Sequence, residues 1–168
     1  MHANDHIFRD LHPTRIHFHE GVVKWNLIGM PYNFKKLLKD ATFTGHLNYT
    51  AVELIKDSKA LTKAADIWAL GCCFFFLATK RDPFTPEHVR SDPKQIKKNI
   101  IAGIIDVERP KDEPNDVKHK VLHNLLAACL EPDSKKRVNA AMLLKLIDEQ
   151  ICEHANLLQN IQIGKRQR

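Results

Sequence analysis

The feature that most constrains the fold is the stretch of residues 67–78, which contains no charged side chain. Asp66 stands immediately before it and Lys80 shortly after it. A helix that crosses a bilayer needs roughly 20 apolar residues, so this stretch is too short to span a membrane. It predicts instead a helix that is buried on all sides. The amphipathic segments elsewhere in the chain are then expected to pack around it.

Three later segments are predicted to be these surrounding helices. The first, residues 93–102, opens with a proline after Asp92 and stops before Gly103, an arrangement typical of helix ends. The other two are residues 117–130 and 139–158, where apolar residues recur at three- and four-residue spacing. The residues expected on the buried sides are Ile96, Ile100, Ile101, Val121, Leu122, Leu125, Leu126, Cys129, Met142, Leu143, Leu146, Ile147 and Ile151.

A small β-hairpin is predicted before the central helix. In residues 16–19 apolar residues alternate with His17 and His19, Glu20-Gly21 forms a turn, and residues 22–25 are again mostly apolar. The two histidines would share one face of the strand and could together bind a metal ion. Because no further ligand lies nearby in the sequence, we rank a metal site last among the candidate functions.

Composition predicts one mainly α domain, residues 1–158, followed by a basic tail, residues 159–168. The net charge is +6 and the isoelectric point about 9.2, but the basic residues are scattered. The sequence has no zinc-finger or aromatic RNA-binding motif, so it does not favour a nucleic-acid partner. A basic module for nucleic acid or an anionic surface is kept as an alternative, which steep salt dependence of binding would reveal.

Cysteine usage predicts the cytoplasm or another reducing intracellular compartment. The cysteines are Cys72, Cys73, Cys129 and Cys152. They include no Cys-x-x-Cys pair, so a structural zinc site is not expected. We expect buried, reduced thiols, two of them adjacent in the apolar stretch. Residues 1–5 lack the basic start and apolar core of a signal peptide.

Five segments carry short motifs in a fixed order. Residues 8–13 read Phe-Arg-Asp-Leu-His-Pro, residues 27–29 Leu-Ile-Gly, residues 45–53 Gly-His-Leu-Asn-Tyr-Thr-Ala-Val-Glu, residues 66–71 Asp-Ile-Trp-Ala-Leu-Gly, and residues 130–137 Leu-Glu-Pro-Asp-Ser-Lys-Lys-Arg. They resemble the catalytic loop, the Asp-Phe-Gly segment, the end of the activation segment, the central F helix and the late arginine segment of eukaryotic protein kinases. The resemblance implies the larger, C-terminal lobe of that fold, with helices around a buried central helix.

The same resemblance shows departures at the positions that serve catalysis. Asp10 matches the catalytic base, but His12 stands at the lysine position, and Arg15 and Leu27 stand where kinases have their two Mg²⁺ ligands. An apolar side chain cannot ligate a hard cation, and an arginine repels it. The resemblance therefore implies no Mg-ATP, no other cofactor and no bound metal, with Asp10 and His12 as remnants of a catalytic site.

The sequence also has no counterpart of the smaller kinase lobe or of the E helix. Together with the lost ligands, this favours a catalytically inactive, pseudokinase-like lobe that acts as a binding or scaffold subunit rather than as an enzyme. The alternative is a fragment of a serine/threonine kinase whose smaller lobe is missing from this chain. Because the E helix is missing, we expect a groove along the central helix, near Ile7 and Phe8, that a protein partner or a missing segment of the same protein fills.

Three residues are assigned structural roles by the resemblance. The Asp66 carboxylate is expected to accept hydrogen bonds from backbone amides of residues 8–10. Glu53 and Arg137 are expected to form a buried ion pair that joins the activation segment to the helical base. These contacts would explain why the three residues are present without any catalytic function.

One regulatory role is also implied. Thr42 lies three residues before Gly45, where many kinases carry an activation-loop phosphate. Arg9 matches the arginine that receives such a phosphate, and the new ion pair would order the loop. The alternative is an unmodified surface threonine, which we favour in a chain without activity.

Overall fold

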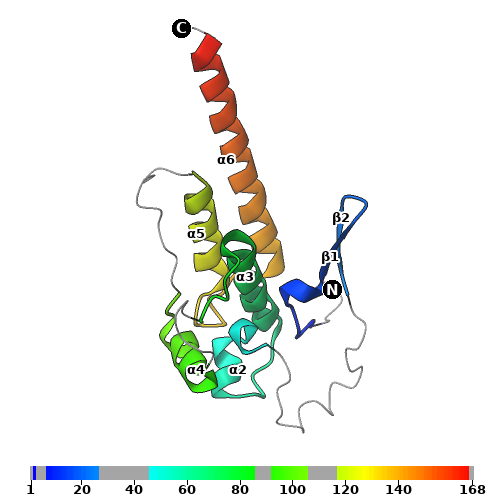
Figure 1. Cartoon of the computed structure of the whole chain (residues 1–168), viewed down its shortest axis with the longest axis vertical. Coiled ribbons are helices and arrows are strands. Elements are labelled where there is room, and N and C mark those ends of the chain that lie inside the picture. The colour runs from blue at the N-terminus through cyan, green and yellow to red at the C-terminus, as the bar shows by residue number, and fades with distance from the viewer. Residues whose placement is uncertain (1, 3–6, 27–45, 86–91, 106–116, 167–168) are drawn as a thin grey trace.

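The computed structural model describes residue 2 and residues 7–26, 46–85, 92–105 and 117–166. This part of the chain is mainly helical, with a two-stranded antiparallel sheet near its N-terminal end. In Figure 1 the helices gather around α3 (Lys63–Thr79), and the sheet stands to one side of them. The predicted fold class is confirmed.

Helix α3 forms the centre of the core. It begins after Thr62, whose backbone is extended, and ends at Lys80, which adopts a left-handed φ of 60°. Its buried residues are Ala65, Asp66, Ile67, Trp68, Ala69, Gly71, Cys72, Cys73 and Phe75. The last turn differs, because Phe74 and Phe76 are half-buried and Leu77 is exposed. The prediction of burial on all sides therefore holds for most of α3 and is wrong at its C-terminal end.

Short elements link α3 to the next helix. The 3-10 turn η3 (Leu47–Tyr49) contacts both α3 and α4 (Pro93–Ala102), and α2 (Val52–Lys56) contacts α4. The ends of α4 are the predicted ones. The Asp92 side chain accepts a hydrogen bond from the Lys94 N–H at 3.0 Å, and Gly103 ends the helix with a left-handed φ of 65°.

Two long helices complete the base. Helix α5 (Val117–Cys129) packs along α3, and α6 (Ala140–Arg166) packs along α5. Asn139 caps α6, since its side-chain oxygen accepts a hydrogen bond from the Met142 N–H at 2.9 Å. The helix continues to Arg166, beyond the end predicted at residue 158. Figure 1 shows the C-terminal half of α6 extending past the other helices.

Three residues predicted to be buried are exposed in the structure. Ile101, Met142 and Ile151 are 50%, 57% and 61% exposed. Apolar spacing identifies the face of a helix that can be buried, but the neighbouring elements decide how much of that face is covered. Leu143 lies on the covered side of α6 and is 2% exposed, as predicted. In the described ranges, no helix is long and apolar enough to cross a bilayer.

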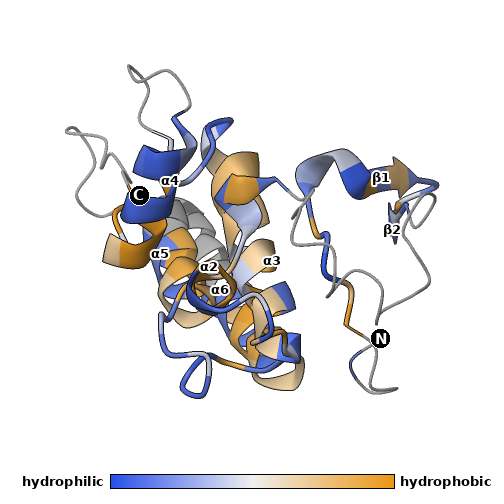
Figure 2. Ribbon diagram, turned by 90° about the horizontal axis from the view of Figure 1, so that it is seen from below, coloured by the Kyte–Doolittle hydropathy of each residue, from blue (hydrophilic) through white to orange (hydrophobic). Residues whose placement is uncertain are grey.

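The predicted hairpin is present as β1 (Ile16–His19) and β2 (Val22–Trp25), preceded by the 3-10 turn η2 (Pro13–Arg15). Its turn, Glu20-Gly21, has φ angles of 49° and 75°, the left-handed pair that a tight two-residue hairpin requires. Trp25 packs against Phe8 with ring centroids 5.4 Å apart. Through Phe8, this contact attaches the hairpin to the hydrophobic core. Figure 2 shows β1 and β2 to one side of the helices.

Candidate functional site

Asp66, in the first turn of α3, holds the loop that carries the catalytic-loop motif. Its two carboxylate oxygens accept hydrogen bonds from the backbone N–H groups of Phe8 at 2.7 Å and Arg9 at 2.8 Å. Arg9 has a left-handed φ of 72°, a conformation that costs a non-glycine residue about 1–3 kcal/mol and that these bonds hold in place. The contacts expected for Asp66 are confirmed. A further contact, with His2 Nε2 at 2.8 Å, was not expected from the sequence.

Asp10, at the position of a catalytic base, is paired with Arg15. The Arg15 Nε and Nη2 atoms lie 2.7 Å and 2.6 Å from Asp10 Oδ2, and the two side chains are only partly exposed. Arg15 Nη1 also donates to the Asn26 carbonyl at 3.4 Å. A guanidinium group has only donors, so it cannot ligate a cation. The Asp10–Arg15 pair therefore does not fit a Mg²⁺ site.

His12, at the lysine position, is buried under a second histidine. The His12 and His46 rings are stacked, with centroids 3.6 Å apart, and the Tyr49 ring meets His12 edge-on at 4.4 Å. His12 Nδ1 accepts a hydrogen bond from the Thr14 N–H at 3.2 Å, which caps η2. Burial, and to a lesser extent the neighbouring His46, lower the pKa of His12 below its usual value. The arrangement thus favours a neutral imidazole at this position.

The residues that follow His46 are anchored from the opposite side. The Tyr49 hydroxyl donates to Asp82 Oδ1 at 3.0 Å, and Asn48 exchanges hydrogen bonds with the Thr85 hydroxyl at 2.8 and 3.1 Å. Burial, followed by the nearby Asp82 carboxylate, raises the pKa of Tyr49. Tyr49 therefore keeps its proton and remains a hydrogen-bond donor.

Glu53 and Arg137 form the expected buried pair. Arg137 Nη1 and Nη2 donate to Glu53 Oε1 and Oε2 at 2.8 and 2.9 Å, and the two side chains are 0% and 12% exposed. Arg137 also donates to the carbonyls of Ala64 at 2.8 Å and Glu131 at 2.9 Å, and its guanidinium lies 4.9 Å from the centre of the Trp68 ring. One side chain thus joins α2, the start of α3 and the segment between α5 and α6.

Two of the predicted site residues, Leu27 and Thr42, lie outside the described residues. Within the described ranges, no three His, Cys, Asp or Glu residues are grouped so that they could hold a metal ion. His17 and His19 are both exposed on β1. The hypothesis of a metal site at these two histidines gains no support from the structure.

All four cysteines are free thiols, and Cys152 is exposed rather than buried. Cys72, Cys73 and Cys129 are buried as expected. Burial raises the pKa of Cys73 and of Cys129 to about 12. Since the thiolate is the reactive form of cysteine, these buried thiols serve the core rather than chemistry.

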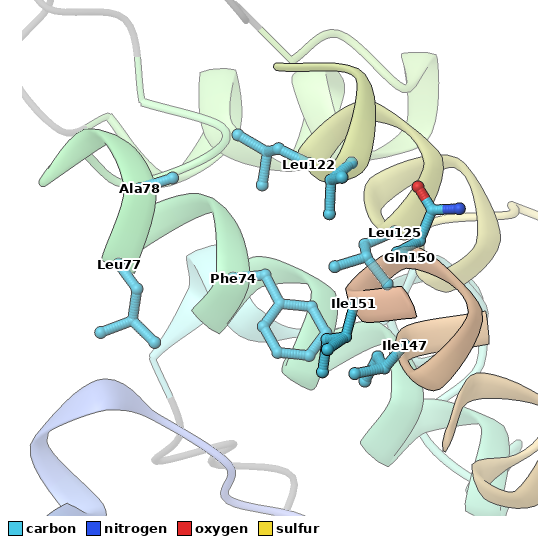
Figure 3. Close-up of a pocket in the computed structure, with 9 residues that line it drawn as sticks. Phe74, Leu77, Ala78, Leu122, Leu125, Ile147, Gln150 and Ile151 are labelled. Atoms are coloured by element: carbon cyan, nitrogen blue, oxygen red, sulfur yellow. The ribbon is translucent and has the colours of Figure 1, made fainter. Parts of the chain in front are cut away.

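An apolar groove lies at the C-terminal end of α3, between that helix, α5 and α6. Its volume is about 570 Å³, and Figure 3 shows side chains of the three helices facing a common space. The lining residues are Phe74, Leu77, Ala78, Val121, Leu122, Leu125, Ile147, Gln150 and Ile151. The groove expected along the central helix near Ile7 and Phe8 stays a prediction, but Phe8 itself does not line an open groove. Phe8 is 3% exposed, since Trp25 and Asp66 hold it in the core.

The retained structural contacts and the order of the elements define one class of protein. The family model for the protein kinase domain matches residues 1–147. The chain belongs to this family, and its described fold is that of a kinase-like C-terminal lobe.

Several curated kinases are similar to the chain. Mitogen-activated protein kinase kinase kinase 15 of Mus musculus is 32% identical over 149 residues, which cover 86% of this chain and 11% of the relative. Mitogen-activated protein kinase kinase kinase 5 of Homo sapiens is 31% identical over 153 residues, covering 89% and 10%. Dual specificity protein kinase TTK of Mus musculus is 27% identical over 158 residues, covering 86% and 17%. The chain thus spans about a tenth of the first two relatives.

Sequence reasoning identified the residues of this site but missed how some of them pair. Arg15 was expected to repel a cation, and its contact with Asp10 was not foreseen. A spacing of five residues across a proline-led turn is the only indication of that contact in the sequence. The His12–His46 stack joins two motifs that are far apart along the chain, so nothing local predicts it.

Proposed function

We propose that this chain is a catalytically inactive, kinase-like lobe that acts as a binding or scaffold subunit of a larger assembly. The ion pair between Asp10 and Arg15 carries this proposal. Kinase chemistry requires the base carboxylate to accept a proton from the attacking hydroxyl while nearby residues hold Mg²⁺. Here a fixed positive charge occupies the carboxylate, and the residue that supplies it stands at a metal-ligand position.

The preserved contacts support a structural role. The bonds from Asp66 to the Phe8 and Arg9 amides and the bidentate Glu53–Arg137 pair act on the fold and need no nucleotide. Selection for folding without selection for catalysis would retain these contacts and release the positions that hold Mg²⁺. A protein of this kind functions through its surface.

The test is to measure nucleotide binding and phosphate transfer. The sample is the protein purified from its natural source, together with any polypeptide that copurifies with residues 1–168. We expect no difference in the affinity for a non-hydrolysable ATP analogue with and without Mg²⁺, and no phosphate transfer to a generic protein substrate. Arg15→Asn restores an amide oxygen at a ligand position. This variant is measured beside the unaltered protein in the same assays. Mg²⁺-dependent binding together with transfer that Asp10→Asn abolishes would overturn the proposal.

The second candidate function is that of a fragment of an active serine/threonine kinase. The coverage of the relatives favours it, because the aligned part is only 10–11% of the mitogen-activated protein kinase kinase kinases. The same measurement separates the two candidates, since a fragment of an active kinase requires activity in native material. Asp10 would then be its base, and Arg15 would have to move away from it.

The apolar groove is the proposed surface for a protein partner that covers the central helix. Phe74, Leu77 and Ala78 of α3 recur at the three- and four-residue spacing of a helix face, as do Ile147 and Ile151 with Gln150 on α6. Ridges at this spacing are complementary to those of another helix. We therefore take the occupant to be an amphipathic helix that offers its own apolar stripe.

The groove is tested on isolated residues 1–168 with a dye that binds exposed apolar surface and with sedimentation analysis. We expect dye binding and self-association, both reduced by Leu77→Glu. Leu144→Glu is the matched control, because Leu144 is 60% exposed, similar to Leu77 at 51%, but does not line the groove. A monomer that binds no dye, or an equal effect of the two substitutions, would contradict this assignment.

A further inference from the structure

The stacked His12 and His46 rings join two segments that are distant in the sequence. His12 lies just before η2 in the catalytic-loop motif, and His46 is the N-cap residue of η3. His12 is 9% exposed, whereas His46 is exposed and lies on the outside of the stack. The Tyr49 ring closes a third side of His12 at 4.4 Å. We propose that this ring pair is a pH-sensitive contact that holds the start of η3 against the catalytic-loop segment and releases it on acidification.

Protonation of His12 acts on two contacts at once. In the neutral ring Nδ1 accepts the Thr14 N–H bond at 3.2 Å and lies 2.9 Å from the Thr14 hydroxyl. A protonated Nδ1 loses the first bond, which caps η2, and can only donate to the hydroxyl. A positive charge on His12 would also stand 3.6 Å from the centre of the His46 ring, in a site that water reaches poorly. Because His46 is exposed, it can leave the stack without crossing the core. The structure thus supplies both a cause of release and a direction for it.

The charges that face His12 do not offset this effect. The groups around it are Asp10, Arg15, His46, Tyr49 and Asp82. Asp10 is engaged by Arg15 at 2.6 Å, and Asp82 accepts the Tyr49 hydroxyl at 3.0 Å. Both carboxylates therefore have closer partners than His12. Burial and His46 dominate, and the pKa of His12 is lowered.

The sign of the pH effect follows from this direction. A histidine whose pKa is lower in the folded state binds fewer protons there than in the open state. The stacked ring contact is therefore fully favoured above about pH 6.5, the ordinary pKa of histidine. It loses stability as the pH falls below that value. Opening should become more frequent as the pH falls through this window.

The readout is the protection of two backbone amides against hydrogen exchange in residues 1–168. The Tyr49 N–H donates to the His46 carbonyl at 2.9 Å, and the Thr50 N–H donates to the Leu47 carbonyl at 3.0 Å. Their protection factors, corrected for intrinsic exchange, should fall between pH 7.5 and pH 5.5. The titration of His12, followed by proton NMR, should have its midpoint below pH 6.5.

His12→Asn is the decisive variant, since an asparagine oxygen can still cap η2 but does not titrate. Protection of the Tyr49 amide should then lose its pH dependence. His17→Asn, which removes an exposed histidine of β1, is the control and should leave that dependence unchanged. If His12→Asn does not fold, the unaltered chain still decides the matter. Protection that is independent of pH, or that changes in a range where His12 does not titrate, would overturn the proposal.

Discussion

Two arginine–carboxylate pairs in the described part of the chain differ in reach and in surroundings. Glu53 and Arg137 are 84 residues apart, and their side chains are almost fully buried. Asp10 and Arg15 are five residues apart, and their side chains are 31% and 24% exposed. The first pair joins three parts of the helical base, whereas the second closes one turn at the surface. We therefore expect the fold to depend on the first pair much more than on the second.

The largest effect should come from breaking the buried pair. Arg137→Met leaves the Glu53 carboxylate and the carbonyls of Ala64 and Glu131 without their donor, and we expect a loss of about 3–5 kcal/mol in the free energy of unfolding. Urea denaturation of residues 1–168 measures it. Adding Glu53→Gln to Arg137→Met should restore part of the loss, because the unpaired charge is removed. A loss below about 1 kcal/mol would mean that the pair is as weak as an exposed one.

The Asp66 contacts should be the next strongest. Asp66→Ala removes the acceptor for the Phe8 and Arg9 amides and should cost about 1–3 kcal/mol. Asp66→Asn keeps one acceptor oxygen and should cost less. His2→Ala is the matched control, since it removes only the contact of a partly buried ring. Equal melting temperatures for Asp66→Ala and the unaltered chain would show that Asp66 does not hold this loop.

The close approach of α3 and α5 gives a third test of the helical base. A methyl group on Gly71 would lie 2.6 Å from the Cys129 Cβ, so Gly71→Ala should cost about 1–3 kcal/mol through overpacking. Cys129→Gly should recover part of this loss, whereas Cys129→Ala keeps the Cβ and should not. Recovery with both second substitutions would show that the contact lies elsewhere.

The smallest effect is expected at the surface pair. Arg15→Asn should change the free energy of unfolding by no more than about 1 kcal/mol, because the pair is partly exposed to water and joins residues only five apart. Urea denaturation beside Arg137→Met gives the direct comparison. A loss as large as that of Arg137→Met would end the distinction between the two pairs.

The sequence predicts the helices and strands of this lobe better than it predicts which of their faces are buried. The uncharged stretch marks α3, and alternation with a Glu20-Gly21 turn marks the hairpin, because both patterns reflect local geometry. The exposure of Met142 and Ile151 could not be predicted, since it depends on which part of α6 meets α5. The groove beside Leu77 could not be predicted for the same reason, whereas Phe8 packs in the core.

The site residues were found through their family motifs. The contacts that could be predicted are those that belong to the family pattern. The Glu53–Arg137 and Asp66 contacts belong to the family pattern and are present. The His12–His46 stack arises from residues that depart from the pattern at His12, so the pattern cannot predict it. Departures from a family motif therefore need a structure before they can be interpreted.

The separation of Glu53 and Arg137 has a consequence for synthesis of the chain. At about 5–20 residues per second, a ribosome needs roughly 4–17 s to add the 84 residues between the two positions. Within that interval α2 and then α3 are completed, while the arginine that packs on Trp68 and binds Glu53 does not yet exist. The face of Trp68 that Arg137 covers therefore stays uncovered until residue 137 has been added.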